Sequence, residues 1–275
     1  MPCPEHSRER GVTLIEMVIV ISITAIIAGA VSVFISRPVE GYADAARRAE
    51  MSDIADTALR RMTRDLRTAL SNSIRTTTVS GVLYLEYLQS SGGGRYRAEN
   101  TNDPLNPGDP LDFTNPLGDS SFDVIGTMPT LAAGDSIVIY NLASSGTTAN
   151  AYVGDNRGAY SSKTATTITL APAKQFPFPS PGKRFHVVQH AVTYACNPAT
   201  GELRRYWGYG IVDPQPTPPA TPNNALLASN VALCSFTYVT SGAALRTGVV
   251  MLSLKIQQSG ESIQLFQQVH VTNVP

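Results

Sequence analysis

An apolar segment near the amino terminus, residues 12–35, constrains the fold of this chain more than any other feature. As a helix it would be about 36 Å long at 1.5 Å per residue, and about 20 mainly apolar residues suffice to cross a bilayer. Ser22, Thr24 and Ser32 interrupt the apolar character, and we expect their hydroxyls to bond back to the helix backbone. The sequence therefore predicts a transmembrane helix at residues 12–37.

A carboxylate, that of Glu16, lies among apolar residues close to the start of this segment. An ionised glutamate in hydrocarbon is costly, so a glutamate at this position needs either a partner or a function. The simpler interpretation is that Glu16 stays hydrated at the membrane interface.

Two other interpretations of the segment compete with a specialised one. A secretory signal would be cleaved near Ala28-Gly29-Ala30, but its apolar region should span only about 7 to 15 residues. A plain single-pass anchor stays open, because bilayer physics does not require removal of a leader. The positive-inside rule gives no clear orientation, since arginines lie on both sides of the segment: Arg8 and Arg10 before it, and Arg37, Arg47 and Arg48 after it.

The residues around Gly11 resemble the class III signal of type IV pilins and pseudopilins: a short polar leader ends at Gly11, and Val-Thr-Leu-Ile-Glu and the apolar run follow. This resemblance implies that a prepilin peptidase cuts after Gly11 and methylates the new amine of Val12, where the family usually has phenylalanine or methionine. It also implies that Glu16 pairs with the terminal amine of a neighbouring subunit. Two charges buried together in lipid cost far less than either one alone.

The resemblance implies an α+β, pilin-like fold, in which a long amino-terminal transmembrane and amphipathic helix packs on an antiparallel β-rich globular head. We expect a leader at residues 1–11, the transmembrane helix at 12–37, an amphipathic periplasmic part of the helix at 38–72 and the head at 73–275. The precursor would be a single-pass protein of the inner membrane with a periplasmic head, which moves to the pilus, at its tip, after assembly.

The helical pattern continues beyond Arg37-Pro38, where proline should end or kink the membrane segment. Apolar residues then recur at spacings of three and four, and arginines occupy the opposite side. The apolar stripe, expected to pack on the sheet, is Met51, Ala55, Ala58, Met62, Leu66 and Ala69, and the expected solvated face carries Arg60, Arg61, Arg64 and Arg67.

From residue 74 the sequence changes to short runs rich in β-branched and aromatic residues, which predict antiparallel strands. These runs are 82–88, 136–140, 166–170, 185–196, 202–207, 231–239, 249–256 and 262–271. Turn-forming stretches separate them at 90–94, 100–118 and the proline-rich 213–224.

Charge and cysteine content narrow the function. The 21 basic and 21 acidic residues cancel, which argues against a dedicated nucleic-acid binder. Cys3 lies in the expected leader, so Cys196 and Cys234 remain as an even pair in a chain delivered outside the cytoplasm. We expect these two to form a disulfide.

Three later segments, 192–196, 203–209 and 268–275, resemble minor pilins of the mannose-sensitive haemagglutinin (MSHA) pilus. The resemblance implies a subunit that initiates or caps pilus assembly, with other minor and major pilins, the prepilin peptidase and the pilus assembly machinery as partners. A tip adhesin that binds a glycan or surface, and a minor pseudopilin of a type II secretion system, remain alternatives.

Other candidate sites have simpler explanations. His186 and His190 would lie about 13 Å apart along an extended strand, too far to share one metal ion without other ligands. A run of aspartates could bind calcium, although a solvated loop is favoured: Asp103, Asp109, Asp112, Asp119 and Asp123.

The aromatic residues Tyr206, Trp207 and Tyr209 form a possible surface contact for a sugar or another subunit. The alternative is a strand that packs alternate rings inward. The sequence has no convincing nucleophile elbow, zinc-ligand spacing or P-loop. We therefore expect no enzymatic activity, no metal and no cofactor.

Overall fold

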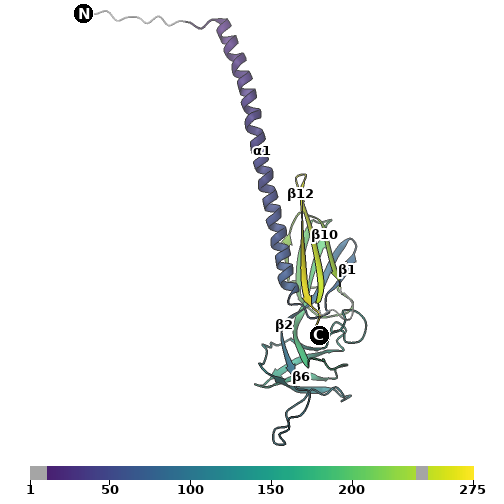
Figure 1. The fold of residues 1–275 in the computed structure, drawn as a ribbon. Helices are drawn as coiled ribbons and strands as arrows, with labels where there is room; N and C mark the ends of the chain where they lie inside the picture. The colour runs from purple at the N-terminus through teal and green to yellow at the C-terminus, as the bar shows by residue number, and fades with distance from the viewer. Residues whose placement is uncertain (1–10, 240–246) are drawn as a thin grey trace, which may run out of the picture. The chain divides into compact units, whose positions relative to one another are not determined.

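The structure, a computed structural model, describes residues 11–239 and 247–275 (Figure 1). The chain divides into two compact units, Met1–Glu50 and Met51–Pro275, and we call the second unit the head. The expected leader, 1–11, lies outside the described residues except for Gly11.

One long helix, α1, spans Leu14–Leu66 and continues through Pro38. Pro38 was expected to end or kink the membrane segment, but the backbone remains helical on both sides of it. The helix ends before the expected residue 72, because the Thr68 hydroxyl donates to the Asp65 carbonyl (2.7 Å) and the chain then turns toward the sheet. Ala69 therefore lies outside the helix, in a bridge to Gln89.

The remaining elements of the described chain are strands, and every pairing between them is antiparallel. They are β1 Arg75–Val79, β2 Val82–Tyr96, β3 Asp119–Ile125, β4 Ser136–Ile139, β5 Arg157–Lys163, β6 Thr167–Lys174, β7 Arg184–Asn197, β8 Glu202–Tyr209, β9 Asn224–Ala228, β10 Val231–Val239, β11 Thr247–Gln258 and β12 Glu261–Thr272. A nine-stranded sheet has the order β1-β2-β3-β6-β5-β4-β7-β8-β9, and β10-β11-β12 form a separate sheet. The α+β fold of a helix on an antiparallel β-rich head is confirmed.

All eight predicted strands are present, but sequence reasoning missed β1, β3, β5 and β9. Their sequences are short or rich in Thr, Ser and Asp, so they lack the apolar alternation that marks a half-buried strand. Pairing with a stronger neighbour supplies what local preference does not: β1, for example, pairs along its whole length with β2. Cross-strand contacts of this kind decide strand formation more than intrinsic propensity does.

The expected turn at residues 90–94 is also wrong, because β2 runs straight through it and pairs with β7, with bulges near Ser90. The glycines serve close backbone approach instead of a turn. A Cβ at Gly93 would lie 2.4 Å from the Phe185 carbonyl oxygen, and one at Gly94 would lie 2.9 Å from the Phe185 ring. Glycine in a strand often marks such an approach.

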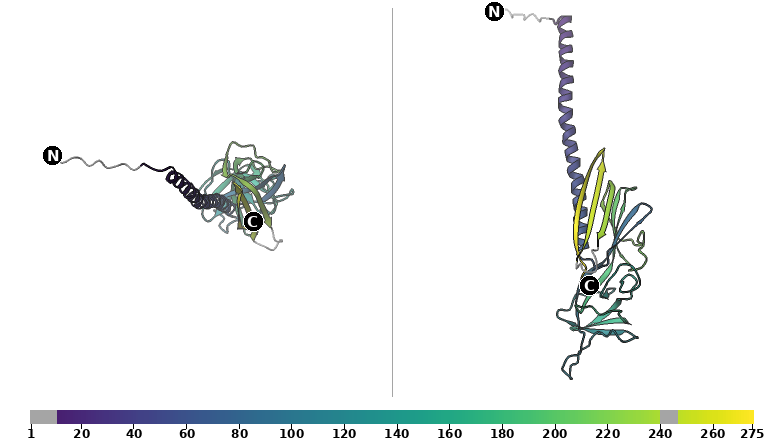
Figure 2. Two further views of the ribbon diagram at one scale, coloured as in Figure 1. Left: turned by 90° about the horizontal axis from the view of Figure 1, so that it is seen from above. Right: turned by 45° about the vertical axis from the view of Figure 1, so that its right-hand side comes forward.

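The portion of α1 within the head buries the predicted apolar stripe. Met51, Ala55, Met62 and Leu66 are fully buried and belong to one hydrophobic cluster with residues of β2, β7, β10, β11 and β12. Figure 2 shows the yellow strands of the three-stranded sheet beside this part of the helix. The four arginines of the opposite face are exposed, as predicted: Arg60, Arg61, Arg64 and Arg67.

The expected disulfide joins Cys196 on β7 to Cys234 on β10, across a sequence separation of 38 residues. These strands belong to different sheets, so the bond links the two sheets of the head. Cross-linking residues this far apart stabilises a fold by about 4 kcal/mol if the loss of chain entropy in the unfolded state dominates.

A buried polar network fixes the end of α1 to the nine-stranded sheet. The Asp65 carboxylate accepts hydrogen bonds from Arg205 Nε (2.8 Å) and the Tyr194 hydroxyl (2.7 Å), and it pairs with Arg61 (3.1 Å). Burial by itself lowers the pKa of the Arg205 guanidinium, but the Asp65 carboxylate reverses this and raises it. Burial also raises the pKa of the Tyr194 hydroxyl, so it remains a donor.

We expect Gly93→Ala to destabilise the head by about 1–3 kcal/mol, because its methyl group would overlap the Phe185 carbonyl and force the strands apart. Gly92→Ala is the matched control, since its nearest neighbour would be Pro129 Cβ at 3.9 Å. Urea unfolding of the full chain in detergent micelles measures both. Equal unfolding midpoints for the two variants would contradict the close-approach role of Gly93.

We expect Asp65→Asn to cost about 3–5 kcal/mol, because it leaves the Arg205 guanidinium buried without a counter-charge. Asp56→Asn is the control, because it also removes one negative charge from α1. Asp56 pairs with Arg60, and the two side chains are 44% and 73% exposed. Such an exposed pair contributes about 0–1 kcal/mol. The same unfolding assay compares the two, and an equal loss of stability in both would show that the Asp65 network does not anchor the helix.

Candidate processing and assembly segment

The expected cleavage site lies in an exposed, non-helical stretch. Residues 11–13 have no regular secondary structure, and α1 begins at Leu14. A Cβ placed at Gly11 would have no atom within 4 Å. The Gly11–Val12 peptide bond therefore precedes the helical backbone and is not covered by other described residues.

Thr13 and Glu16 form the start of the helix. The Thr13 hydroxyl accepts a hydrogen bond from the Glu16 backbone N–H (3.4 Å), and the Thr13 carbonyl accepts one from Met17 (3.2 Å). A threonine followed three residues later by a glutamate is the capping-box pattern of a helix amino terminus. The backbone N–H of Glu16 therefore helps to start the helix, a role that the Thr-Leu-Ile-Glu spacing signals but that was not predicted from the sequence.

The Glu16 carboxylate is exposed and forms no ion pair with any described residue. Its position in the first turn of α1 favours a negative charge, because the helix dipole places partial positive charge at that end. The carboxylate is thus presented on the outer surface of the helix, available to a cation from another chain.

The helix surface from Leu14 to Ile35 is apolar and uncovered. Leu14 is 84% exposed and Phe34 80% exposed, and the most apolar part of α1 has no buried residue. In the described chain, α1 is the helix that has the length and composition needed to span a membrane. Ser22 and Thr24 donate to the carbonyls four residues earlier, at 2.8 and 2.6 Å, so these two hydroxyls are satisfied as expected.

The aromatic residues of β8 do not form a shared surface. Tyr209 is buried, and its hydroxyl donates to the Glu86 carboxylate (2.7 Å), so it is not available as the expected surface contact. Trp207 is half-buried against the main core, with the Arg205 guanidinium 4.9 Å from its ring centre. Tyr206 packs on a separate hydrophobic cluster, to which Tyr209 also belongs. The Tyr209 ring therefore packs inward, as the second interpretation expected, and the rings of Tyr206 and Trp207 are partly buried on opposite sides of the strand.

The candidate metal ligands are not brought together. Within the described residues, no group of three His, Cys, Asp or Glu side chains could hold a metal ion. His186 and His190 both lie on β7, and burial lowers the pKa of each, which favours the neutral ring.

The expected calcium loop is also divided, because Asp119 and Asp123 lie on β3. Their carboxylates accept protein hydrogen bonds: that of Asp123 from Arg97 and Thr167, and that of Asp119 from backbone N–H groups. Burial alone would raise the pKa of Asp123, but these hydrogen bonds and the Arg97 charge lower it. The aspartates therefore stabilise the loop and strand directly.

Comparison with known proteins gives one match. Residues 6–32 match the family model of the prokaryotic N-terminal methylation motif, which supports a type IV pilin or pseudopilin subunit. The motif indicates a structural subunit, processing by a prepilin peptidase and assembly with other pilins. Together with the apolar helix it fits a membrane-anchored precursor. The chain matched no curated protein and no solved structure.

Proposed function

We propose that this chain is a minor pilin-like subunit that initiates or caps assembly of an MSHA-type pilus. The observation that carries this proposal is an exposed apolar helix surface that begins within the methylation motif and carries, between Leu14 and Ile35, the carboxylate of Glu16, which forms no ion pair with any described residue. The resemblance of residues 192–196, 203–209 and 268–275 to the MSHA minor pilin MshO supports the choice of pilus. The placement at the tip rests on the same resemblance and on the size of the head.

The proposed order of events is supported by the geometry at the start of α1. The peptidase cuts the exposed Gly11–Val12 bond, and the new amine then lies two residues before the helix. In lipid, the Glu16 carboxylate and this amine each need a counter-charge, because an isolated ion in hydrocarbon is costly. The amine of one subunit and the carboxylate of the next supply it for each other, and apolar helix surfaces pack around the pair.

A minor pseudopilin of a type II secretion system would use the same segment in the same way. The genes beside this one separate the two: pilin and pilus-assembly genes favour the pilus, and secretin-linked secretion genes favour the pseudopilin.

The first test is the amino terminus of the mature chain. We expect mass spectrometry of the membrane-extracted protein to show a chain that begins at Val12, with or without a methyl group. A plain anchor would keep Met1, and a secretory signal cut after Ala30 would leave Val31. Either of these termini would refute processing at Gly11.

The second test is Glu16→Val. We expect normal insertion and cleavage, because a more apolar helix enters lipid more readily, but failed assembly, because a neighbour's amine would be buried without its counter-charge at a cost of about 3–5 kcal/mol. Glu16→Asp should be intermediate, since it keeps the charge but shortens the reach.

Thr24→Val is the matched control: it removes a polar group from the same helix, where the hydroxyl bonds only to the Val20 carbonyl. The measurement is the share of each variant recovered in sheared pili or cross-linked minor-pilin complexes, relative to its total amount in membranes. Incorporation of Glu16→Val at the level of Thr24→Val would show that Glu16 makes no assembly pair.

A further inference from the structure

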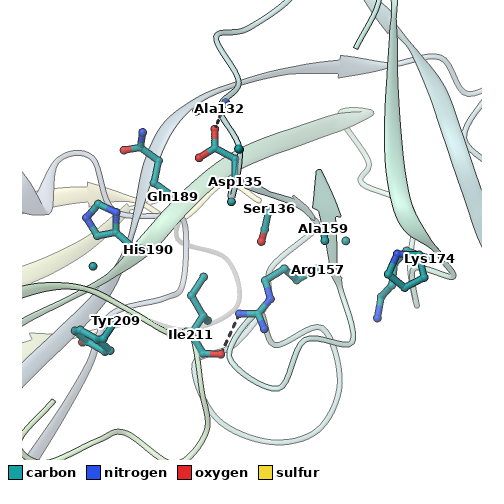
Figure 3. Close-up of a pocket in the computed structure, with 16 residues that line it drawn as sticks. Ala132, Asp135, Ser136, Arg157, Ala159, Lys174, Gln189, His190, Tyr209 and Ile211 are labelled. Atoms are coloured by element: carbon teal, nitrogen blue, oxygen red, sulfur yellow. Dashed lines mark hydrogen bonds between the residues drawn. The ribbon is translucent and has the colours of Figure 1, made fainter. Parts of the chain in front are cut away.

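The head contains an open pocket (Figure 3). It has a volume of about 810 Å³ and lies between the 132–136 loop, strands β5 and β6, and the adjoining parts of β7 and β8. This volume is in the range of small-molecule sites, which are about 300–1,000 Å³. All of its lining residues belong to the head.

Arg157 enters this pocket without a carboxylate partner. Its guanidinium donates to the Ile211 carbonyl (3.2 Å), but it forms no ion pair with any described residue. Other shielded arginines of the head do have such a partner: Arg75 pairs with Glu86 (2.5 Å), Arg97 with Asp123 (3.1 Å) and Arg205 with Asp65 (2.8 Å). A partly buried guanidinium whose fork is not matched by a carboxylate is suited to bind one from outside.

Lys174 adds a second positive charge to the same pocket. Its ammonium donates to the Gly154 carbonyl (2.7 Å) and also makes no ion pair among the residues that the structure describes. Burial lowers the pKa of both Lys174 and Arg157, as expected for cations removed from water, and for Lys174 the charge of Asp155 offsets this only in part. The Asp155 carboxylate itself accepts hydrogen bonds from the backbone N–H groups of Ala149 and Asn150.

The one carboxylate in the lining does not neutralise these cations. Asp135 is buried, and its carboxylate turns to the backbone of its own loop, where it accepts the Ala132 N–H (2.8 Å). Figure 3 shows this hydrogen bond on the side of the pocket away from the Arg157 guanidinium, which bonds to Ile211. The pocket therefore presents positive charge.

The rest of the lining is neutral but polar. Gln189 is exposed at the pocket, and His190 and Ser136 are half-buried in its wall. Amide, imidazole and hydroxyl groups both donate and accept hydrogen bonds, which suits a ligand that carries several hydroxyl groups. The apolar lining consists of small residues, such as Ala133 and Ala159, together with Pro172, Ile211 and the ring of Tyr209.

We infer that this pocket binds a carboxylated saccharide, with the carboxylate held by Arg157 and Lys174 and the sugar hydroxyls by Gln189, Ser136 and His190. A bare inorganic anion would use only the two cations and leave most of the cavity to water. A neutral sugar would leave the two cations unmatched. The inference concerns the head alone and goes beyond the proposed role in assembly.

The test is a ligand-observed NMR titration of the full chain in detergent micelles with glucuronic acid and galacturonic acid. Glucose serves as the neutral sugar and acetate as the bare carboxylate. We expect saturable binding of at least one uronic acid, and binding of glucose and acetate about tenfold weaker or less, since each lacks one half of the recognition. No saturable binding of either uronic acid, or equal binding of glucose or acetate, would overturn the inference.

Two variants locate the site. Arg157→Gln should weaken uronic-acid binding about tenfold or more, as expected for loss of a charge-assisted hydrogen bond, whereas Arg184→Gln, which removes a positive charge from an exposed position on β7, should leave it unchanged. Gln189→Trp fills the pocket from an exposed position and decides the question if Arg157→Gln does not fold. Unchanged binding in Gln189→Trp, or in a folded Arg157→Gln, would place the ligand elsewhere.

Glu16→Val should bind the uronic acid as the parent does. Failure of the saccharide inference would therefore leave the assembly proposal untouched, and failure of assembly would leave the pocket untouched.

Discussion

The uncovered apolar surface of α1 between Leu14 and Ile35 is the constraint on which the rest of the molecule depends. Each buried square ångström of apolar surface is favoured by about 25 cal/mol, yet no described part of the chain covers these residues. The surface needs lipid or the helices of other subunits. Such an exposed segment fits a membrane-anchored precursor, which agrees with the methylation motif at residues 6–32.

The same helix follows a different rule within the head. From Met51 to Leu66 the apolar residues occupy one stripe, and that stripe is buried in the main core. At the carboxyl-terminal end of α1, polar interactions hold the helix to the nine-stranded sheet: Asp65 pairs with Arg205 and accepts a hydrogen bond from the Tyr194 hydroxyl. The disulfide between β7 and β10 adds a covalent link between the two sheets that this core joins. Helix, ion pair and disulfide thus stabilise one hydrophobic cluster.

The features that were predictable from the sequence are those with a strong local pattern. The helix, its apolar stripe and the strands from β6 to β12 other than β9 have clear periodicity, and the disulfide follows from the even pair of cysteines. The glycine-rich part of β2 was predicted to be a turn, because glycine favours turns locally. Here the glycines instead allow Phe185 to approach the strand. Polar strands such as β1 and β5 depend on their neighbours, which no local pattern reveals.

The candidate sites differ in the same respect. Gly11, Val12 and Glu16 lie within six consecutive residues, so their motif is legible without a fold. The pocket gathers Arg157, Lys174 and His190 from β5, β6 and β7, which follow one another in the chain, but β4 lies between β5 and β7 in the sheet, and no local pattern predicts that order. Tyr209 shows the converse error: it looked like part of a surface run, but a strand bulge and the Glu86 carboxylate place it inside.

The start of α1 at Glu16 and the pocket at Arg157 differ from the rest of the molecule in how their charges are balanced. Exposed ions such as the Asp56–Arg60 pair gain little from a partner, because water already solvates them. Several shielded ions of the head, such as Asp65, are paired within the chain. Glu16 and Arg157 differ from both cases, because neither forms an ion pair with any described residue. Arg157 lies at a partly enclosed pocket, and Glu16 lies at the start of an apolar helix that fits a membrane anchor. Lipid and a partly enclosed pocket both solvate an ion less well than bulk water does. In the two proposals made above, their counter-charges come from other molecules: a neighbouring subunit at Glu16 and an anionic ligand at Arg157.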